Sequence, residues 1–204
     1  GGNWVGYHKV SVNARHPTEY FRRHQHPADR FDTQRVPILP WAEGRSAVLV
    51  AGMGPKAAAV EHLATERWER DIIAELRRLT DRPIIYRPKP SHPNPQPIKG
   101  ARFSASDPKK KAEPLERVLA ECYAVVTHHS NTAVDGLLAG VPAFVWEGVA
   151  APLGLTDLNL LETPARPEGR REWAADVAYC QWNIDEMRQG LAWRHLRDEE
   201  LVKA

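Results

Sequence analysis

Apolar runs of strand length alternate with stretches of helical periodicity through the middle of the chain. The predicted elements, in order, are a strand at 46–51, a helix at 65–79, a strand at 83–87, a helix at 114–122, a strand at 124–127, a helix at 132–139 and a strand at 143–146. Short continuous apolar runs are typical of buried parallel strands. Strands that alternate with helices predict the α/β class, here a Rossmann-like parallel sheet flanked by helices with right-handed crossovers.

The two ends of the chain differ from this central pattern. Residues 1–45 are predicted to form an N-terminal arm, with an edge strand or hairpin arm at 4–12 and irregular surface structure at 15–35. Residues 46–204 are predicted to form one ligand-binding domain that ends in helices. Those helices are expected at 170–181 and 185–196, and Thr65 is expected to cap the helix that follows it.

Three loops are expected at the carboxyl edge of the sheet, where open parallel sheets bind ligands. The loop Gly52–Lys56 has glycines that let backbone approach a ligand, although a plain turn is equally compatible. Arg87 and Lys89 are two cations on a proline-bracketed segment, which suits an anion, or else a solvated loop. Glu147 ends the fourth strand at the same edge.

The third loop, His128–Thr132, lies between a strand and a short helix. Ser130, Asn131 or Thr132 can cap that helix, and free N–H groups beside them would form an anion site. Asp135 follows about one turn later and could accept hydrogen bonds from a sugar hydroxyl. A well-capped helix in an ordinary α/β core is the alternative interpretation.

The residues Ser130, Thr132, Asp135, Gly140 and Pro142 form a pattern that resembles a known family. A Ser/Thr-rich turn, a small helix, an acid and then Gly-x-Pro resembles the donor-binding, C-terminal half of GT-B glycosyltransferases and of sugar-nucleotide 2-epimerases. In that family the helix N-terminus holds the nucleotide diphosphate and the acid holds the ribose. The family's acid is usually Glu, and the Gly often found in its turn is absent here.

The resemblance implies a nucleotide-activated sugar as substrate, transferred to an unknown acceptor by a metal-independent glycosyltransferase without a further cofactor. In this interpretation the histidines of the third loop contact phosphate or transfer a proton, with a pKa in the useful range. The expected catalytic residues are His128 and His129. The expected nucleotide-sugar-binding residues are Gly52, Gly54, Lys56, Arg87, Lys89, Ser130, Asn131, Thr132, Asp135 and Glu147.

Length raises the question of partners, because a two-domain enzyme of this type needs well over 204 residues. A second chain would supply an acceptor domain, or the N-terminal 45 residues would do a reduced version of that work, or no transfer would occur. A non-catalytic nucleotide-binding module and a nucleotide-sugar epimerase or hydrolase are the other functions considered. The net charge of +2 gives a nucleic acid acceptor no special support.

Composition is ordinary for a soluble globular protein, with 42% hydrophobic and 26% charged residues. Two cysteines without metal spacing, no apolar run of membrane-spanning length and no signal peptide predict a cytoplasmic protein that makes no membrane contact. The chain starts at Gly1 rather than Met, which leaves open whether it is a fragment.

His24, His26 and Asp29 are residue types that bind metals, but no further ligand is recognisable in the sequence. A solvated loop is therefore preferred, and no metal site is predicted.

Overall fold

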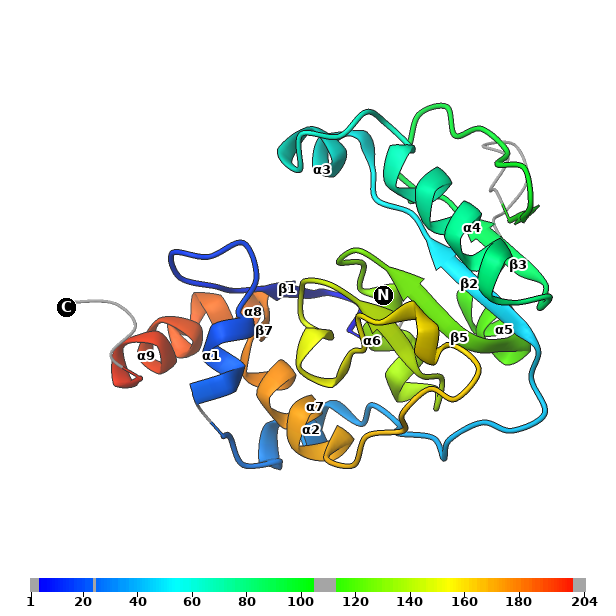
Figure 1. Cartoon of the computed structure of the whole chain (residues 1–204). Helices are drawn as coiled ribbons and strands as arrows, with labels where there is room; N and C mark the ends of the chain where they lie inside the picture. Colours follow the sequence, from blue (N-terminus) through cyan, green and yellow to red (C-terminus); the bar gives the residue numbers. More distant parts are fainter. Residues whose placement is uncertain (1–3, 24, 105–112, 200–204) are drawn as a thin grey trace.

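The computed structural model describes residues 4–23, 25–104 and 113–199 (Figure 1). The strands are β1 (Tyr7–Lys9), β2 (Ala47–Ala51), β3 (Ile84–Arg87), β4 (Arg102–Phe103), β5 (Cys122–Thr127), β6 (Ala143–Val145) and β7 (Gln181–Asn183). The helices are α1 (Thr18–Arg23), α2 (Asp29–Gln34), α3 (Pro55–Val60), α4 (Arg67–Leu79), α5 (Leu115–Glu121), α6 (Thr132–Leu138), α7 (Arg170–Tyr179), α8 (Ile184–Arg188) and α9 (Leu191–Asp198), with 3-10 turns η1 (Ala151–Leu153) and η2 (Leu158–Leu160).

A five-stranded parallel sheet with the order β4-β3-β2-β5-β6 forms the centre of the molecule. In its middle, Leu49 of β2 lies beside Ile85 of β3 and Val125 of β5. Each strand and helix predicted between residues 46 and 146 is present, with its ends within two residues of the prediction. The predicted α/β class and Rossmann-like parallel sheet are therefore confirmed.

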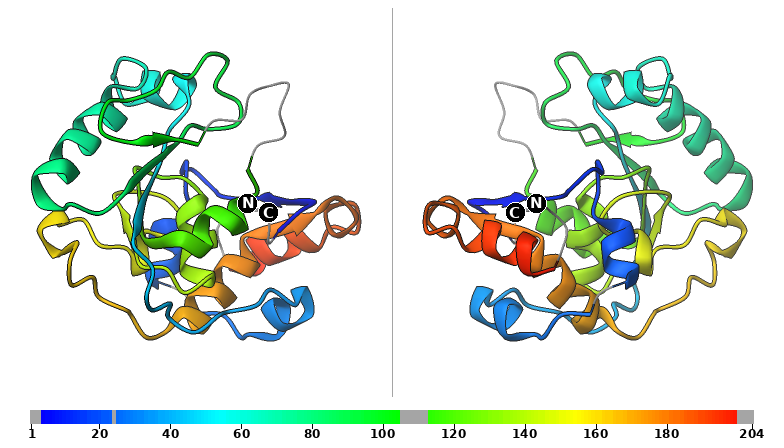
Figure 2. Two further views of the ribbon diagram at one scale, coloured as in Figure 1. Left: turned by 90° about the vertical axis from the view of Figure 1, so that its right-hand side faces the viewer. Right: turned by 90° about the vertical axis from the view of Figure 1, so that its left-hand side faces the viewer.

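Helices cover both faces of the sheet, as the alternation of side chains along each strand requires. Val48 and Val50 pack in one apolar cluster with Ile73 and Leu76 of α4. Leu49 belongs to the cluster on the other face, with side chains of α5, α6 and α7. Figure 2 shows α4 on one side of the sheet and α5 and α7 on the other. Full burial of each such side chain contributes about 1.5–3 kcal/mol, so both layers stabilise the sheet.

The N-terminal arm is more regular than predicted. Residues 7–9 form the expected short strand, but it pairs antiparallel with β7 in a separate two-stranded sheet, Tyr7 opposite Asn183. The prediction of irregular structure at 15–35 was wrong, because α1 and α2 lie in this segment. These helices are too short to show a helical period in sequence. Helix α2 is held by Phe31, only 3% exposed, which joins the core against α7, and Tyr20 of α1 packs partly buried against the same core.

Three local predictions are also corrected. The glycine loop is shorter than expected because Pro55 starts α3, where its fixed φ and missing N–H suit a first helical position. Thr65 does not cap α4; Glu66 holds the N-cap in a left-handed conformation, and its carboxylate accepts a hydrogen bond from the Gln96 N–H at 2.7 Å. The segment 185–196 is two helices, separated at Gly190 (φ 73°).

The turn after α6 depends on a glycine. Gly140 has φ 74°, and a Cβ at this position would lie 1.9 Å from the Pro40 carbonyl oxygen. The Ala42 N–H donates to the Gly140 carbonyl, and the Leu39 N–H donates to Leu138. These contacts hold the segment between arm and sheet against the end of α6. No helix in the described ranges has the length and apolar character to cross a membrane.

Candidate functional site

A cavity of about 550 Å³ lies at the carboxyl edge of β2, β3 and β5. The chain leaves those strands at Ala51, Arg87 and Thr127, so the three following loops meet at one edge, as expected for parallel strands. The cavity is lined by Lys9, His16, Ala51, Gly52, Met53, Arg87, Pro88, Lys89, Pro90, Leu115, Glu116, His129, Ser130, Asn131, Thr132 and Asp135.

Most of the candidate residues meet in this cavity. Those that line it are Gly52, Arg87, Lys89, His129, Ser130, Asn131, Thr132 and Asp135. Those that do not are Gly54, Lys56, His128 and Glu147. Lys56 is exposed on α3, and Glu147 is exposed beyond β6. Gly54 begins α3, and the His128 ring turns towards Trp68, 6.0 Å away between ring centroids.

The first glycine of the first loop, Gly52, has a structural explanation. A Cβ on Gly52 would come 2.9 Å from Glu69 Oε1 and 3.2 Å from the Tyr86 ring. The same Glu69 oxygen accepts a hydrogen bond from the Met53 N–H at 2.8 Å, so the fully buried carboxylate holds the loop. Burial raises the pKa of Glu69, which the Met53 hydrogen bond opposes. Close packing against Glu69 and Tyr86 therefore accounts for glycine at position 52 without a ligand.

Arg87 supplies the most unusual group in the cavity. Its Nη1 is buried, and no group in the described residues accepts a hydrogen bond from it. Burial lowers the pKa of this guanidinium, while the carboxylates of Glu113 and Glu116 raise it. Arginine stays protonated in proteins. The cavity wall therefore contains a positively charged guanidinium group, and at least one of its nitrogen atoms, Nη1, donates no hydrogen bond to the described residues.

The N-terminal arm forms the opposite wall, which the sequence analysis did not foresee. Lys9 and His16 line the cavity, and Lys9 Nζ lies 3.0 Å from His16 Nδ1. Because an ammonium group can only donate, His16 Nδ1 accepts and its proton is on Nε2. That Nε2 is buried, without a partner among the described residues. Within the described part of the chain, His16 is therefore a second residue with a buried donor and no acceptor.

The hydrogen-bond partners of His129 also fix the proton positions of the pair His128 and His129. Arg15 Nη2 lies 3.0 Å from His129 Nε2 and can only donate, so the His129 proton is on Nδ1. His129 Nδ1 lies 2.9 Å from His128 Nδ1, which must then be the acceptor. Burial, followed by the charge of Arg15, lowers the pKa of His129 to about 4. The expectation of a useful pKa near neutrality was wrong for His129, which is uncharged at pH 7.

The start of α6 also differs from the expected anion site. The Thr132 N–H donates to Ser130 Oγ at 3.2 Å, and the Ala133 N–H donates to the Ser130 carbonyl at 3.0 Å. The Ser130 N–H faces Thr127 Oγ1 at 3.3 Å. The predicted free N–H groups at Ser130 and Thr132 are therefore engaged within the turn, and the side chains of this turn line the cavity instead. Asp135 is buried at 5% exposure.

Glu61, His128 and His129 bring potential metal-binding atoms within 4.8 Å of one another beside the cavity. The Arg15 guanidinium contacts both Glu61 and His129. Because a cation already pairs with Glu61 and with His129, we interpret these residues as a hydrogen-bonded and ion-pair network rather than as a metal site. In sequence, the only hint of this wall was the abundance of His and Arg in the arm, which specifies no geometry.

Comparisons with known proteins give limited similarity. No family model matches the chain, and no curated protein matches it. A β-Kdo 2,7 transferase KpsC structure of Thermosulfurimonas dismutans aligns with a TM-score of 0.45 and 16% identity, over 78% of this chain and 51% of that one. A β-Kdo 2,4 transferase KpsC structure of the same organism aligns with a TM-score of 0.43 and 13% identity, over 85% and 61%. The chain thus spans about half to three-fifths of these proteins, and neither likeness assigns it an activity.

Proposed function

We propose that this chain binds a nucleotide-activated sugar in the cavity at the carboxyl edge of the sheet and transfers the sugar to an acceptor. The observation that carries the proposal is that two residues lining this cavity, Arg87 and His16, each have a buried nitrogen donor, Nη1 and Nε2, without an acceptor among the described residues. A buried donor without a partner costs about 1–3 kcal/mol. A diphosphate, rich in acceptor oxygens, would remove that cost at both groups.

The charges around the cavity favour the same class of ligand. Lys9, Arg87 and Lys89 line it, and they exceed in number the acids Glu116 and Asp135. In the proposed reaction, Arg87 and Lys89 neutralise the charge that develops on the departing phosphate group. No metal ion and no further cofactor takes part, so donor binding is expected to be independent of Mg²⁺.

Asp135 is the proposed partner of the ribose. Its carboxylate lies at the cavity wall one turn after Asn131, and ionised carboxylates accept hydrogen bonds from hydroxyl groups. His129, uncharged near neutral pH, would serve as a hydrogen-bonding partner or proton acceptor rather than as a cation. The acceptor would be held by a second chain or by the N-terminal arm, whose Lys9 and His16 line the same cavity.

The test is thermal unfolding against nucleoside diphosphates and nucleotide sugars of each base, with an activated form of Kdo in the panel. A ligand at 100 times its Kd stabilises the native state by about 2.7 kcal/mol, which raises the midpoint measurably. The ligand that binds is then incubated with candidate acceptors, and the products are separated. Transfer to an acceptor supports the proposal; release of free sugar indicates a hydrolase, binding without turnover indicates a binding module, and no shift with any ligand refutes the site.

A further inference from the structure

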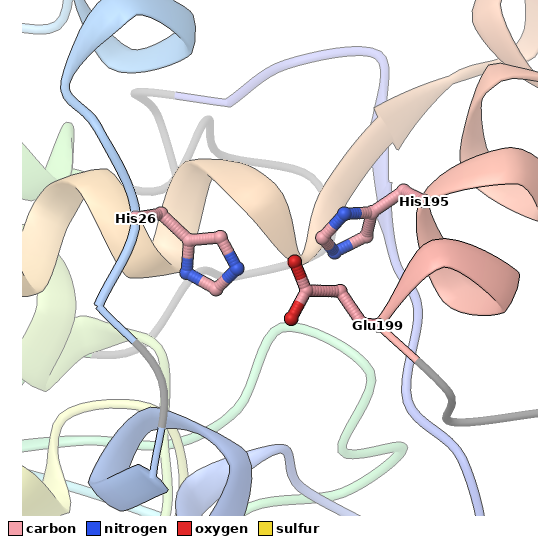
Figure 3. A group of neighbouring side chains, drawn as sticks. All are labelled: His26, His195 and Glu199. Carbon is pink, nitrogen blue, oxygen red and sulfur yellow. The ribbon is translucent and has the colours of Figure 1, made fainter.

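A second group of chemically active side chains lies at the junction of the arm and the C-terminal helices. His26 follows α1, His195 lies on α9, and Glu199 is the C-cap of the same helix. One nitrogen of each imidazole and one carboxylate oxygen lie within 4.8 Å of one another. Figure 3 shows the three side chains pointing towards a common point from two separate segments.

His26 is held in one orientation by a buried acid. Asp176 of α7, 7% exposed, accepts hydrogen bonds from the His26 backbone N–H at 2.8 Å and from Nδ1 at 2.9 Å. The Nδ1 proton is thereby fixed, and the Nε2 lone pair faces the interior of the group. The His26 ring also stacks on Tyr179, with centroids 4.4 Å apart. A carboxylate behind a histidine is the arrangement that typically orients metal-binding histidines.

The other two side chains have the spacing of a helical metal-binding pair. His195 and Glu199 are four residues apart, so their side chains lie on one face, one turn from each other. His195 Nε2 lies 3.1 Å from the Tyr20 hydroxyl, and His26 Nε2 lies 2.5 Å from the same hydroxyl. Both nitrogens therefore point to one small volume between the arm and α9.

We propose that His26, His195 and Glu199 bind a divalent transition metal ion, with Zn²⁺ the best match. Two imidazole nitrogens and one carboxylate are a donor set that Zn²⁺ takes readily, whereas Mg²⁺ and Ca²⁺ prefer oxygen ligands alone. The Tyr20 hydroxyl or a water molecule completes the coordination. The ion would tie the arm to α9, and this proposal does not depend on the proposed transferase activity.

The competing explanation is a hydrogen-bonded chain from Asp176 through His26 and Tyr20 to His195, which needs no metal. The two explanations differ in what happens when zinc is added. The chain should be produced without a polyhistidine tag, treated with EDTA, freed of chelator and titrated with ZnSO₄ or MgCl₂ by calorimetry. Thermal unfolding with and without Zn²⁺ gives an independent readout.

Binding of about one Zn²⁺ per chain, with a higher unfolding midpoint and no response to Mg²⁺, is the expected result. His195→Ala should abolish this binding and Glu199→Gln should weaken it at least tenfold, while Asp176→Asn should weaken it about 10- to 100-fold, because the carboxylate that orients the His26 ring is lost. Glu199→Gln replaces a half-buried side chain at the C-cap of α9 by one of the same size, so this variant is expected to fold. It therefore still tests the proposal if His195→Ala fails to fold.

Two controls locate the site. His8→Ala removes an exposed histidine from β1, and His129→Ala removes one from the group around Arg15. Both variants should bind Zn²⁺ as the parent chain does. Absence of Zn²⁺ binding, or binding that survives Glu199→Gln and His195→Ala but is lost in His129→Ala, would overturn the proposal.

Discussion

Replacement of Arg87 by methionine separates a ligand-binding arginine from a structural one. Methionine keeps much of the apolar stem but removes the charge and the buried Nη1 donor that lacks an acceptor among the described residues. If Arg87 serves the fold, Arg87→Met should lower stability. If it serves a ligand, stability should hold while binding is lost.

The expected magnitudes follow from the surroundings of the side chain. An unsatisfied buried donor costs about 1–3 kcal/mol, and its removal offsets the lost attraction to Glu113 and Glu116. We therefore expect the free energy of unfolding of Arg87→Met to lie within about 1 kcal/mol of the parent value, or above it. Loss of a charged hydrogen bond to a phosphate oxygen costs about 1.5–3 kcal/mol, which weakens binding about 10- to 150-fold.

Urea unfolding measures the first quantity, and calorimetry with the nucleotide identified in the panel, or with pyrophosphate, measures the second. The matched control is Arg78→Met on α4, an arginine whose side chain is 73% exposed and paired with Glu75. It should change neither quantity, since exposed ion pairs contribute about 0–1 kcal/mol. Destabilisation of Arg87→Met by more than 2 kcal/mol with unchanged affinity, on the order of the penalties above, would refute the argument.

Further predictions concern the ribose, the arm and the turn after α6. Asp135→Ala should weaken nucleotide binding by about 1–3 kcal/mol in calorimetry, and unchanged affinity would exclude the ribose assignment. The pKa of both His16 and His129 is lowered from its ordinary value of 6.5 to about 4, mainly by burial. Between pH 4 and 6.5 the unfolded chain then binds more protons than the folded chain. The free energy of unfolding, measured with urea, should therefore fall as the pH drops from 6.5 towards 4, and it should fall less in a His16→Gln/His129→Gln double variant. Gly140→Ala should destabilise by several kcal/mol, on the order of the severe cases in mutational surveys, because its Cβ would overlap the Pro40 carbonyl; a circular dichroism melt unchanged within about 1 °C would contradict this.

The sheet edge could be predicted because its signals are local. Val48, Leu49 and Val50 form a continuous apolar run, and such a run followed by glycines or cations fixes both a strand and the loop at its carboxyl end. Parallel strands then bring Arg87 and Asp135 to one edge whatever the details of packing. The cavity contains both.

The arm could not be predicted because its contacts are long-range. His16 meets His129 across more than a hundred positions, with ring centroids 5.7 Å apart, and His26 meets Asp176 in the same way. Neither pairing leaves a period or a motif in the sequence. For the same reason no further metal ligand beside His26 is recognisable in the sequence, whereas the fold places His195 and Glu199 beside it.

The two proposals meet in the arm. Lys9 and His16 line the cavity, and the proposed metal site contains Tyr20 of α1 and His26, which follows α1. Beside the cavity the arm makes the ion pair of Arg15 with Glu61, in which the Arg15 side chain is 38% exposed, and exposed ion pairs contribute little. A metal ion bound at His26 would restrict the motion of the arm on the far side of α1 from Lys9 and His16. Less conformational entropy would then be lost when Lys9 and His16 are held against a ligand. Affinity in the cavity would then depend on an ion that never touches the bound nucleotide.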